Sequence, residues 1–181
     1  MSRVQLVNPA ATTPNRQALL DQIQKAFGAT PNIFKAVANS PAALKSMWAS
    51  FGALGAGVLG AKLGEQIAVA IANRNRCEYC LAAHTALGKK AGASAEEMSS
   101  AQAGHAIDPR AAAAVKFALK VVNNRAQLAS ADVSDLRAAG FDDEHIVEIL
   151  AHVALNVFTN YVNVALEVPV DFPKVALTPV A

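Results

Sequence analysis

Four pairs of a small polar residue and a proline mark points where apolar residues begin to recur at helical spacing. The pairs are Thr13-Pro14, Thr30-Pro31, Ser40-Pro41 and Asp108-Pro109. A side-chain oxygen at the N-cap satisfies a free backbone N–H, and proline at the first helical position already has the required φ. Almost no stretch alternates polar and apolar residues in the manner of a half-buried strand. The sequence therefore predicts an all-α fold, an oligomeric helical bundle.

Later capping signals complete the set of predicted helices. Ser94 and Glu97 fit a capping box, and Asp142 is placed to cap the last helix, with Phe141 and Ile146 as a hydrophobic staple. That helix is expected over residues 143–166 and is apolar on most sides, so it should be buried or at a subunit interface. The other helices are expected to begin near residues 14, 31, 41, 63, 77, 95, 109 and 130.

The size and composition of the chain predict one domain that associates with copies of itself. Of 181 residues, 53% are hydrophobic and only 17% are charged, against about 25% charged in an average domain. So little charge leaves apolar surface that a monomer covers poorly, so we expect a homo-oligomer. Residues 1–166 should form the helical domain, with its core motif at about 51–103. Residues 167–181 contain three prolines and are expected to form a C-terminal arm lying on a neighbouring subunit.

Charge and hydropathy argue against two classes of partner. The net charge is +2 and no basic stripe with interleaved aromatic residues occurs, which argues against nucleic acid. The N-terminus lacks the apolar core of a signal peptide, and the apolar stretches are expected to be too short to span a membrane. We therefore expect a cytoplasmic protein. In that compartment a C-x-x-C is more often catalytic, redox-active or metal-binding than structural.

The two cysteines of the chain, Cys77 and Cys80, form such a motif, and His84 follows one turn later. On a helix the three side chains fall within an arc of about 60°. A thiolate is the reactive form of cysteine, and both His84 and the helix N-terminus favour it. Attack of Cys80 on a peroxide would give a sulfenic acid, with which Cys77 condenses to a disulfide. The motif thus predicts a thiol peroxidase that needs an external dithiol.

Three further residues are candidates for the same site. Glu65 is the only acidic residue between Phe51 and Arg76, and we favour it as the group that orients His84. The alternative is an exposed first-turn glutamate favoured by the helix dipole. Trp48 and Tyr79 are candidates for a substrate pocket near the thiols, and the Tyr79 hydroxyl for a donor to a peroxide oxygen or to Glu65.

The last predicted helix carries a row of polar residues whose role is open. These residues recur at roughly helical spacing and are His152, Asn156, Thr159, Asn160 and Asn163. Buried polar side chains need partners, so the row should line a pocket or make hydrogen bonds across a subunit interface. We favour the interface.

Two other interpretations of the dithiol remain open from the residues alone. One is a zinc site made by Cys77, Cys80, His84 and one carboxylate, although structural zinc commonly uses two cysteine pairs or one pair with two spaced histidines. The other is a pair of buried cysteines in a helix beside a satisfied core histidine.

The spacing of these residues resembles a known active-site pattern. Glu65 precedes Cys77-x-x-Cys80 by twelve residues, and x-x-x-His84 follows, as in the AhpD-like alkylhydroperoxidases of the carboxymuconolactone decarboxylase superfamily. Residues 149–161 resemble the late helix of its peroxidase-related branch, and the resemblance covers about residues 29–166. It implies an all-helical peroxidase without metal or organic cofactor. Cys80 would attack the peroxide, Cys77 would resolve, His84 would activate Cys80, and Glu65 would orient His84.

The resemblance also implies partners and leaves alternatives. Family members form homotrimers or homohexamers, and AhpD itself is re-reduced by a lipoylated protein. Tyr79 stands where AhpD proper has a second histidine, which changes the expected proton relay. The decarboxylases of the superfamily lack the cysteine pair. The alternatives are a small-acid enzyme of decarboxylase type using Glu65 and His84, and a non-enzymatic helical oligomer with the dithiol as a redox sensor.

Overall fold

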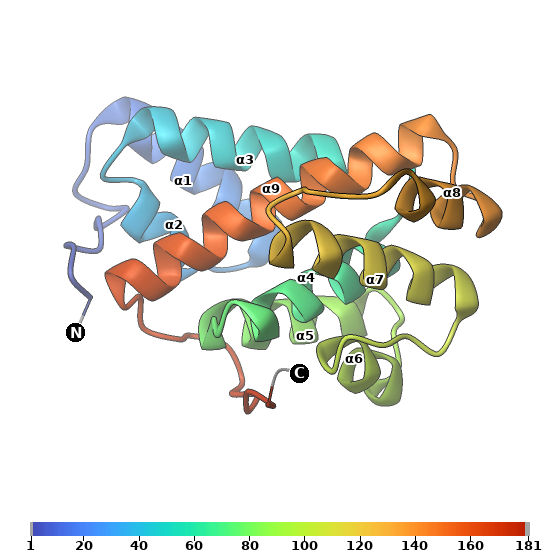
Figure 1. The fold of residues 1–181 in the computed structure, drawn as a ribbon. Coiled ribbons are helices and arrows are strands. Elements are labelled where there is room, and N and C mark those ends of the chain that lie inside the picture. The colour runs from blue at the N-terminus through green and yellow to red at the C-terminus, as the bar shows by residue number, and fades with distance from the viewer. Residues whose placement is uncertain (1, 180–181) are drawn as a thin grey trace.

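The computed structural model describes residues 2–179, and within this range it has nine α-helices and no β-strand (Figure 1). The helices are α1 Pro14–Phe27, α2 Asn32–Val37, α3 Pro41–Gly55, α4 Ala61–Arg74, α5 Glu78–Lys90, α6 Ala95–Gln102, α7 Pro109–Asn123, α8 Ser130–Ala138 and α9 Asp143–Leu166. The predicted all-α class is confirmed.

Most helices begin where the capping signals placed them. The Ser40 hydroxyl accepts a hydrogen bond from Ala43 N at 3.2 Å, and Asp108 accepts one from Ala111 N at 2.8 Å. The capping box of Ser94 and the cap at Asp142 are also present. The second start was predicted one residue early, because Pro31 is the N-cap of α2 and helical geometry begins at Asn32. The Thr30 hydroxyl donates instead to Gln24 Oε1 at 2.9 Å.

The buried apolar side chains form two hydrophobic clusters. The long helix α9 crosses the molecule diagonally (Figure 1). One cluster joins α1, α2 and α3 to the cysteine-bearing start of α5 and to the C-terminal tail. The other joins α4, α7, α8 and α9. The dithiol therefore lies where α5 meets the α1–α3 group, within reach of α9.

Helix α9 corrects the expectation that every apolar stretch is too short to span a membrane. Its 24 residues include an 18-residue window with a mean hydropathy of 1.4, so by length and composition it is apolar enough to cross a membrane. The core helix of a globular protein meets the same criterion, because it too must bury most of its surface. Here α9 packs against α2, α3, α4, α5 and α7.

The C-terminal segment packs against its own chain over residues 167–179, and its placement on a neighbouring subunit stays a prediction. Five of its apolar side chains pack against the first cluster: Val168, Val170, Phe172, Val175 and Leu177. Asp171 accepts a hydrogen bond from Asn32 N at 2.7 Å, and Thr178 N donates to Asn73 Oδ1 at 2.9 Å. Residues 1, 180 and 181 of the two predicted segments lie outside the described residues.

Candidate functional site

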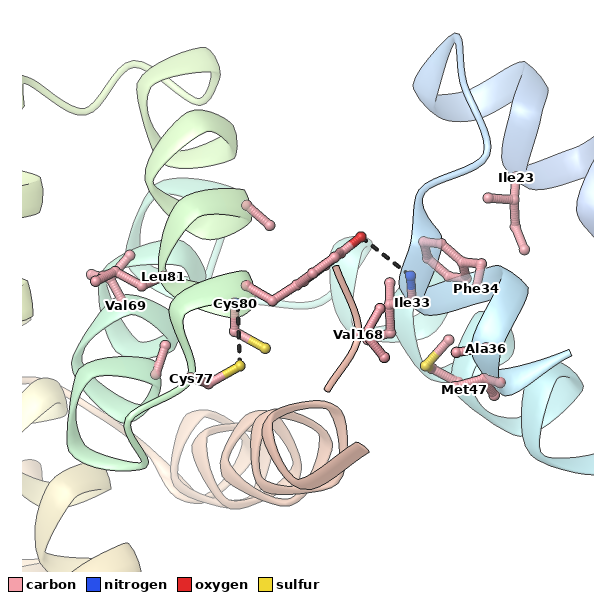
Figure 2. Packing of buried hydrophobic residues seen from close by; sticks show 14 of the residues in the cluster. Ile23, Ile33, Phe34, Ala36, Met47, Val69, Cys77, Cys80, Leu81 and Val168 are labelled. Atoms are coloured by element: carbon pink, nitrogen blue, oxygen red, sulfur yellow. Dashed lines mark hydrogen bonds between the residues drawn. The ribbon is translucent and has the colours of Figure 1, made fainter. Parts of the chain in front are cut away.

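The dithiol is formed at the first turn of α5. Cys77 is the N-cap of this helix and not its first residue, which differs from the expected shared helical face. Its Sγ accepts a hydrogen bond from Cys80 N at 3.2 Å, so the two sulfur atoms lie close together at the helix N-terminus (Figure 2). A sulfur in the N-cap position takes the place of the usual capping oxygen, and the helix dipole favours negative charge there.

The environment of Cys80 stabilises its thiolate. Burial by itself opposes ionisation, since Cys80 is only 2% exposed. The hydrogen bond from Cys77, the charge of His84, and the amides of Asn163 and Asn160 outweigh burial and lower the pKa of Cys80 from 9.0 to about 7. Asn163 Nδ2 donates to Cys80 Sγ at 3.2 Å. A large fraction of Cys80 is therefore ionised at neutral pH.

Cys77 has the opposite environment. Its hydrogen bond to Cys80, then its burial, then the negative charge of Cys80 raise the pKa of the Cys77 thiol far above 9.0. The opposite directions of the two pKa shifts favour the thiolate form of Cys80 over that of Cys77.

His84 and Glu65 meet beside the thiolate. Glu65, from α4, accepts a hydrogen bond from His84 Nδ1 at 2.7 Å, and its side chain is 21% exposed. Burial disfavours the imidazolium, but the charge and hydrogen bond of Glu65, together with the Cys80 charge, raise the pKa of His84 above 6.5. The structure thus brings Glu65, His84 and Cys80 together in the lining of one pocket, and these three residues are here called the Glu65–His84–Cys80 group.

The Glu65–His84–Cys80 group lines an apolar pocket of about 320 Å³. Its walls include the aromatic side chains of Phe27, Phe34, Trp48, Phe51, Tyr79 and Phe172. Its polar groups are Glu65, Cys80, His84, Thr159 and Asn163. Both predicted pocket residues, Trp48 and Tyr79, therefore line it. Such a pocket suits a molecule with an apolar body and a small reactive polar group.

The described residues around the Glu65–His84–Cys80 group do not form a metal-binding cluster. Within residues 2–179, no group of three or more His, Cys, Asp and Glu side chains is arranged to hold a metal ion. The zinc interpretation therefore lacks a ligand set in the described part of the chain.

Comparison with known proteins agrees with this geometry. Residues 41–124, which include Glu65, Cys77, Cys80 and His84, match the carboxymuconolactone decarboxylase family. The AhpD core of a peroxidase-related protein from Ralstonia eutropha superposes with a TM-score of 0.86 at 28% identity, over 94% of this chain and 92% of that one. Residues 41–124 thus carry the pattern of the carboxymuconolactone decarboxylase family, and the chain has the fold of AhpD-like peroxidase-related proteins.

Two further solved structures have a fold similar to that of this chain. A peroxidase-related protein from Silicibacter has a TM-score of 0.81 at 26% identity, over 97% of this chain and 92% of that one. The debrominase Bmp8, solved with 2,3,4-tribromopyrrole, has a TM-score of 0.77 at 19% identity, with 94% of each chain covered, and shows the fold alone. Among curated proteins, none matches the sequence.

Tyr79, where AhpD proper has a histidine, directs its hydroxyl toward α2 and not toward the His84–Glu65 pair. Its hydroxyl accepts a hydrogen bond from Ile33 N at 3.2 Å (Figure 2). Burial, and then the hydrogen bond with Asp171, raise the pKa of Tyr79 well above 10.0. The hydroxyl is thus bound between α2 and the tail, and the expected contact with Glu65 is wrong. Tyr79 contributes its ring to the pocket of this AhpD-like chain.

The polar row on α9 faces the interior of the chain, so the favoured subunit-interface interpretation is wrong for most of it. Four of its members are at most 4% exposed: Asn156, Thr159, Asn160 and Asn163. Thr159 and Asn163 line the pocket, and Asn163 contacts Cys80. Asn163 was missed as an individual site residue. The helical spacing of the polar residues on α9 indicated that they share a face, but it does not identify the helix that this face packs against.

Asn163→Leu tests the contribution of this amide. The variant removes the donor to Cys80 Sγ, so the pKa of Cys80 should rise and its thiolate fraction at neutral pH should fall about fivefold. Folding stability should change little, because Asn163 Oδ1 is buried and has no hydrogen-bond partner in residues 2–179. Titration of the thiolate absorbance measures the first effect and thermal unfolding the second. An unchanged titration midpoint would contradict the assignment.

Proposed function

We propose that this protein is a thiol-dependent peroxidase that reduces organic hydroperoxides by a dithiol–disulfide cycle of Cys77 and Cys80. The observation that carries the proposal is that Cys80 lines an apolar pocket together with the hydrogen-bonded His84–Glu65 pair. The lowered pKa of Cys80 and the raised pKa of Cys77 support it. The peroxidase-related names of the two solved relatives at 28% and 26% identity support it.

The first chemical step uses Cys80 and His84. The Cys80 thiolate attacks the outer oxygen of the hydroperoxide, the O–O bond breaks, and the alkoxide leaves. Because Nδ1 of His84 is bound to Glu65, the proton for the alkoxide comes from Nε2 of the imidazolium. The products are an alcohol, the Cys80 sulfenic acid and a neutral His84. The carboxylate of Glu65 holds the ring in the orientation that this transfer needs.

The second step closes the disulfide. Cys77 gives its proton to neutral His84 and attacks the sulfur of the Cys80 sulfenic acid. The S–O bond breaks, and the departing hydroxide recovers the proton as water. The cycle then requires two electrons from an external dithiol, for which the dithiol of a lipoylated protein is our proposal. No metal or organic cofactor takes part in either step.

Peroxide consumption under turnover tests the proposal. With dihydrolipoamide as reductant, the protein should consume cumene hydroperoxide through many cycles. A single oxidation per chain, with either dihydrolipoamide or another dithiol, would instead support the redox-sensor alternative. Conversion of a small carboxylic acid that survives replacement of both cysteines would support the decarboxylase-type alternative with Glu65 and His84.

The pH dependence of Cys80 oxidation follows from its pKa of about 7. The reactive thiolate is lost as the pH falls through this value, so the rate should decrease on the acid side and reach a plateau on the alkaline side. At pH 6 the second-order rate constant should be about tenfold below the plateau. Stopped-flow measurement of Cys80 oxidation across the pH range gives the midpoint. A midpoint near 9 would contradict the stabilised thiolate.

We also propose a homo-oligomer, a trimer or hexamer, that forms through α9. Five large apolar side chains on this helix are 37–65% exposed, and four of them share one face: Val147, Leu150, Phe158 and Tyr161. At 100° per residue they fall within an arc of about 80°. The face also borders an apolar groove between α3 and α9.

The double variant Leu150→Glu with Phe158→Glu should therefore lower the assembly to monomers, because it would place charge in an apolar interface. Light scattering measures the molecular mass, and circular dichroism should show unchanged helix content. Ile107→Glu is the control, since Ile107 is also exposed but does not lie on α9. Equal masses for all three proteins would exclude this face.

A further inference from the structure

The two cysteines of the dithiol, which are 1% and 2% exposed, line different hollows of the protein. Cys80 lines the apolar pocket, and Cys77 is not among the residues that form it. Cys77 lines a separate hollow of about 200 Å³, here called the Cys77 groove, between the start of α5, the end of α9 and the beginning of the tail. The groove is formed by Arg76, Cys77, Glu78, Tyr79, Asn163, Val164, Glu167, Val168 and Val170.

In thiol–disulfide exchange, the side from which the reductant approaches decides which of the two sulfurs it attacks. The attacking thiolate approaches a disulfide along the S–S bond, so it must reach the chosen sulfur from the side away from its partner. The sulfur that is the weaker base leaves faster. A reductant in the apolar pocket would attack Cys80 and expel Cys77, whereas a reductant in the groove would attack Cys77 and expel Cys80.

We propose that the thiolate of a small alkyl dithiol enters the Cys77 groove and attacks the Cys77 sulfur, so that hydroperoxide and reductant reach the dithiol through separate openings. The proposal rests on the peroxidase function above, because that function creates the disulfide to be reduced. It assigns to the groove a substrate site distinct from the hydroperoxide pocket.

The surroundings of the sulfurs favour this direction. Cys80 leaves into a position where Asn163 Nδ2 donates to its sulfur at 3.2 Å and where His84 supplies positive charge. These groups lower the pKa of Cys80, whereas Cys77 has a raised pKa and would be the poorer leaving group.

Asn163 connects the two openings. It lines both the pocket and the groove, and it is 4% exposed. Its Nδ2 is bound to Cys80, while its buried Oδ1 has no hydrogen-bond partner in the described residues. An orphaned buried acceptor is costly, and the second thiol of the dithiol, which still carries its S–H when the first thiolate attacks, supplies the missing donor.

Two electrons pass from the dithiol to the Cys77–Cys80 disulfide. The first thiolate of the reductant forms a bond to Cys77 Sγ, the Cys77–Cys80 bond breaks, and its electron pair stays on Cys80. The second thiol of the reductant loses its proton and attacks the reductant's own sulfur in the mixed disulfide. The reductant leaves as an intramolecular disulfide, and Cys77 takes up the proton. Valine side chains of α9 and the tail line the path, which suits an alkyl chain.

Trapping of the mixed disulfide tests which sulfur is attacked. The protein is oxidised with diamide, mixed briefly with 2-mercaptoethanol, quenched with acid and alkylated with N-ethylmaleimide. Peptide fragmentation should then show the mercaptoethanol adduct on Cys77 and the maleimide on Cys80, in at least about tenfold excess over the reverse. Equal or reversed labelling would overturn the proposal. Diamide forms the disulfide without peroxide, so the result does not depend on peroxidase activity.

A substitution in the groove gives an independent test. Val164 is 47% exposed on α9, so Val164→Trp should fold and narrow the groove. Reduction of the diamide-formed disulfide by dihydrolipoamide should slow at least about fivefold. Ala165→Trp is the matched control on the neighbouring exposed residue, outside the groove lining. Equal reduction rates for the two variants would overturn the proposal. If the rates differ but no hydroperoxide is consumed, the groove assignment stands and the peroxidase function fails.

Discussion

Cys80→Ser is expected to abolish the turnover of cumene hydroperoxide with dihydrolipoamide, with a loss of at least about a thousandfold. Cys80 is the sulfur that lines the apolar pocket and carries the lowered pKa. A serine hydroxyl at the same position is not ionised at neutral pH and is a poor nucleophile toward peroxide oxygen. The loss of hydroperoxide under steady turnover, compared with the wild-type protein, measures the effect.

Cys77→Ser is the matched control, because it removes the other sulfur of the same motif. This variant keeps the nucleophile and should reduce about one hydroperoxide per chain before it stops. Mass spectrometry should then find the sulfenic acid, or an adduct of it, on Cys80. If Cys80→Ser gave the single oxidation and Cys77→Ser gave none, the roles of the two cysteines would be reversed.

His84→Asn should be the next most damaging change, with kcat/KM for hydroperoxide reduced by about 10² to 10⁴ at neutral pH. In the proposed mechanism, His84 supplies the positive charge beside the Cys80 thiolate and the proton for the leaving alkoxide. Without it the pKa of Cys80 should rise, so the acid limb of the pH–rate profile should move toward higher pH. A residue that served only packing would lower the activity without moving this limb.

Two further variants test whether the effect of His84→Asn comes from its pairing with Glu65 and its place in the pocket. Glu65→Gln keeps an acceptor for His84 Nδ1 but removes the carboxylate charge, so it should lower the pKa of His84 and give a smaller loss of activity. His105→Asn makes the same histidine substitution at an exposed position outside the pocket lining and should be indistinguishable from the wild type. An unshifted profile in His84→Asn would contradict the proton relay.

Local sequence determined most of the helical architecture and the chemical nature of the site. Caps such as Ser40, Asp108 and Asp142 are read within one turn of the chain, because their hydrogen bonds reach only two or three residues ahead. Cys80 and His84 were predicted to be neighbours for the same reason, since they lie one turn apart on α5. Glu65 was selected because a lone carboxylate on an apolar helix needs either solvent or a partner.

Only the tertiary structure decided which faces meet. Asn163 reaches Cys80 from 83 residues away, and nothing in the period of α9 says that its polar row points at α5 and not at a second subunit. The tail likewise buries Val168 and Phe172 against its own chain, and Asp171 and Ile33 together turn the Tyr79 hydroxyl away from Glu65. Helical periodicity encodes the direction of a side chain relative to its own axis, whereas its partner depends on how whole helices pack.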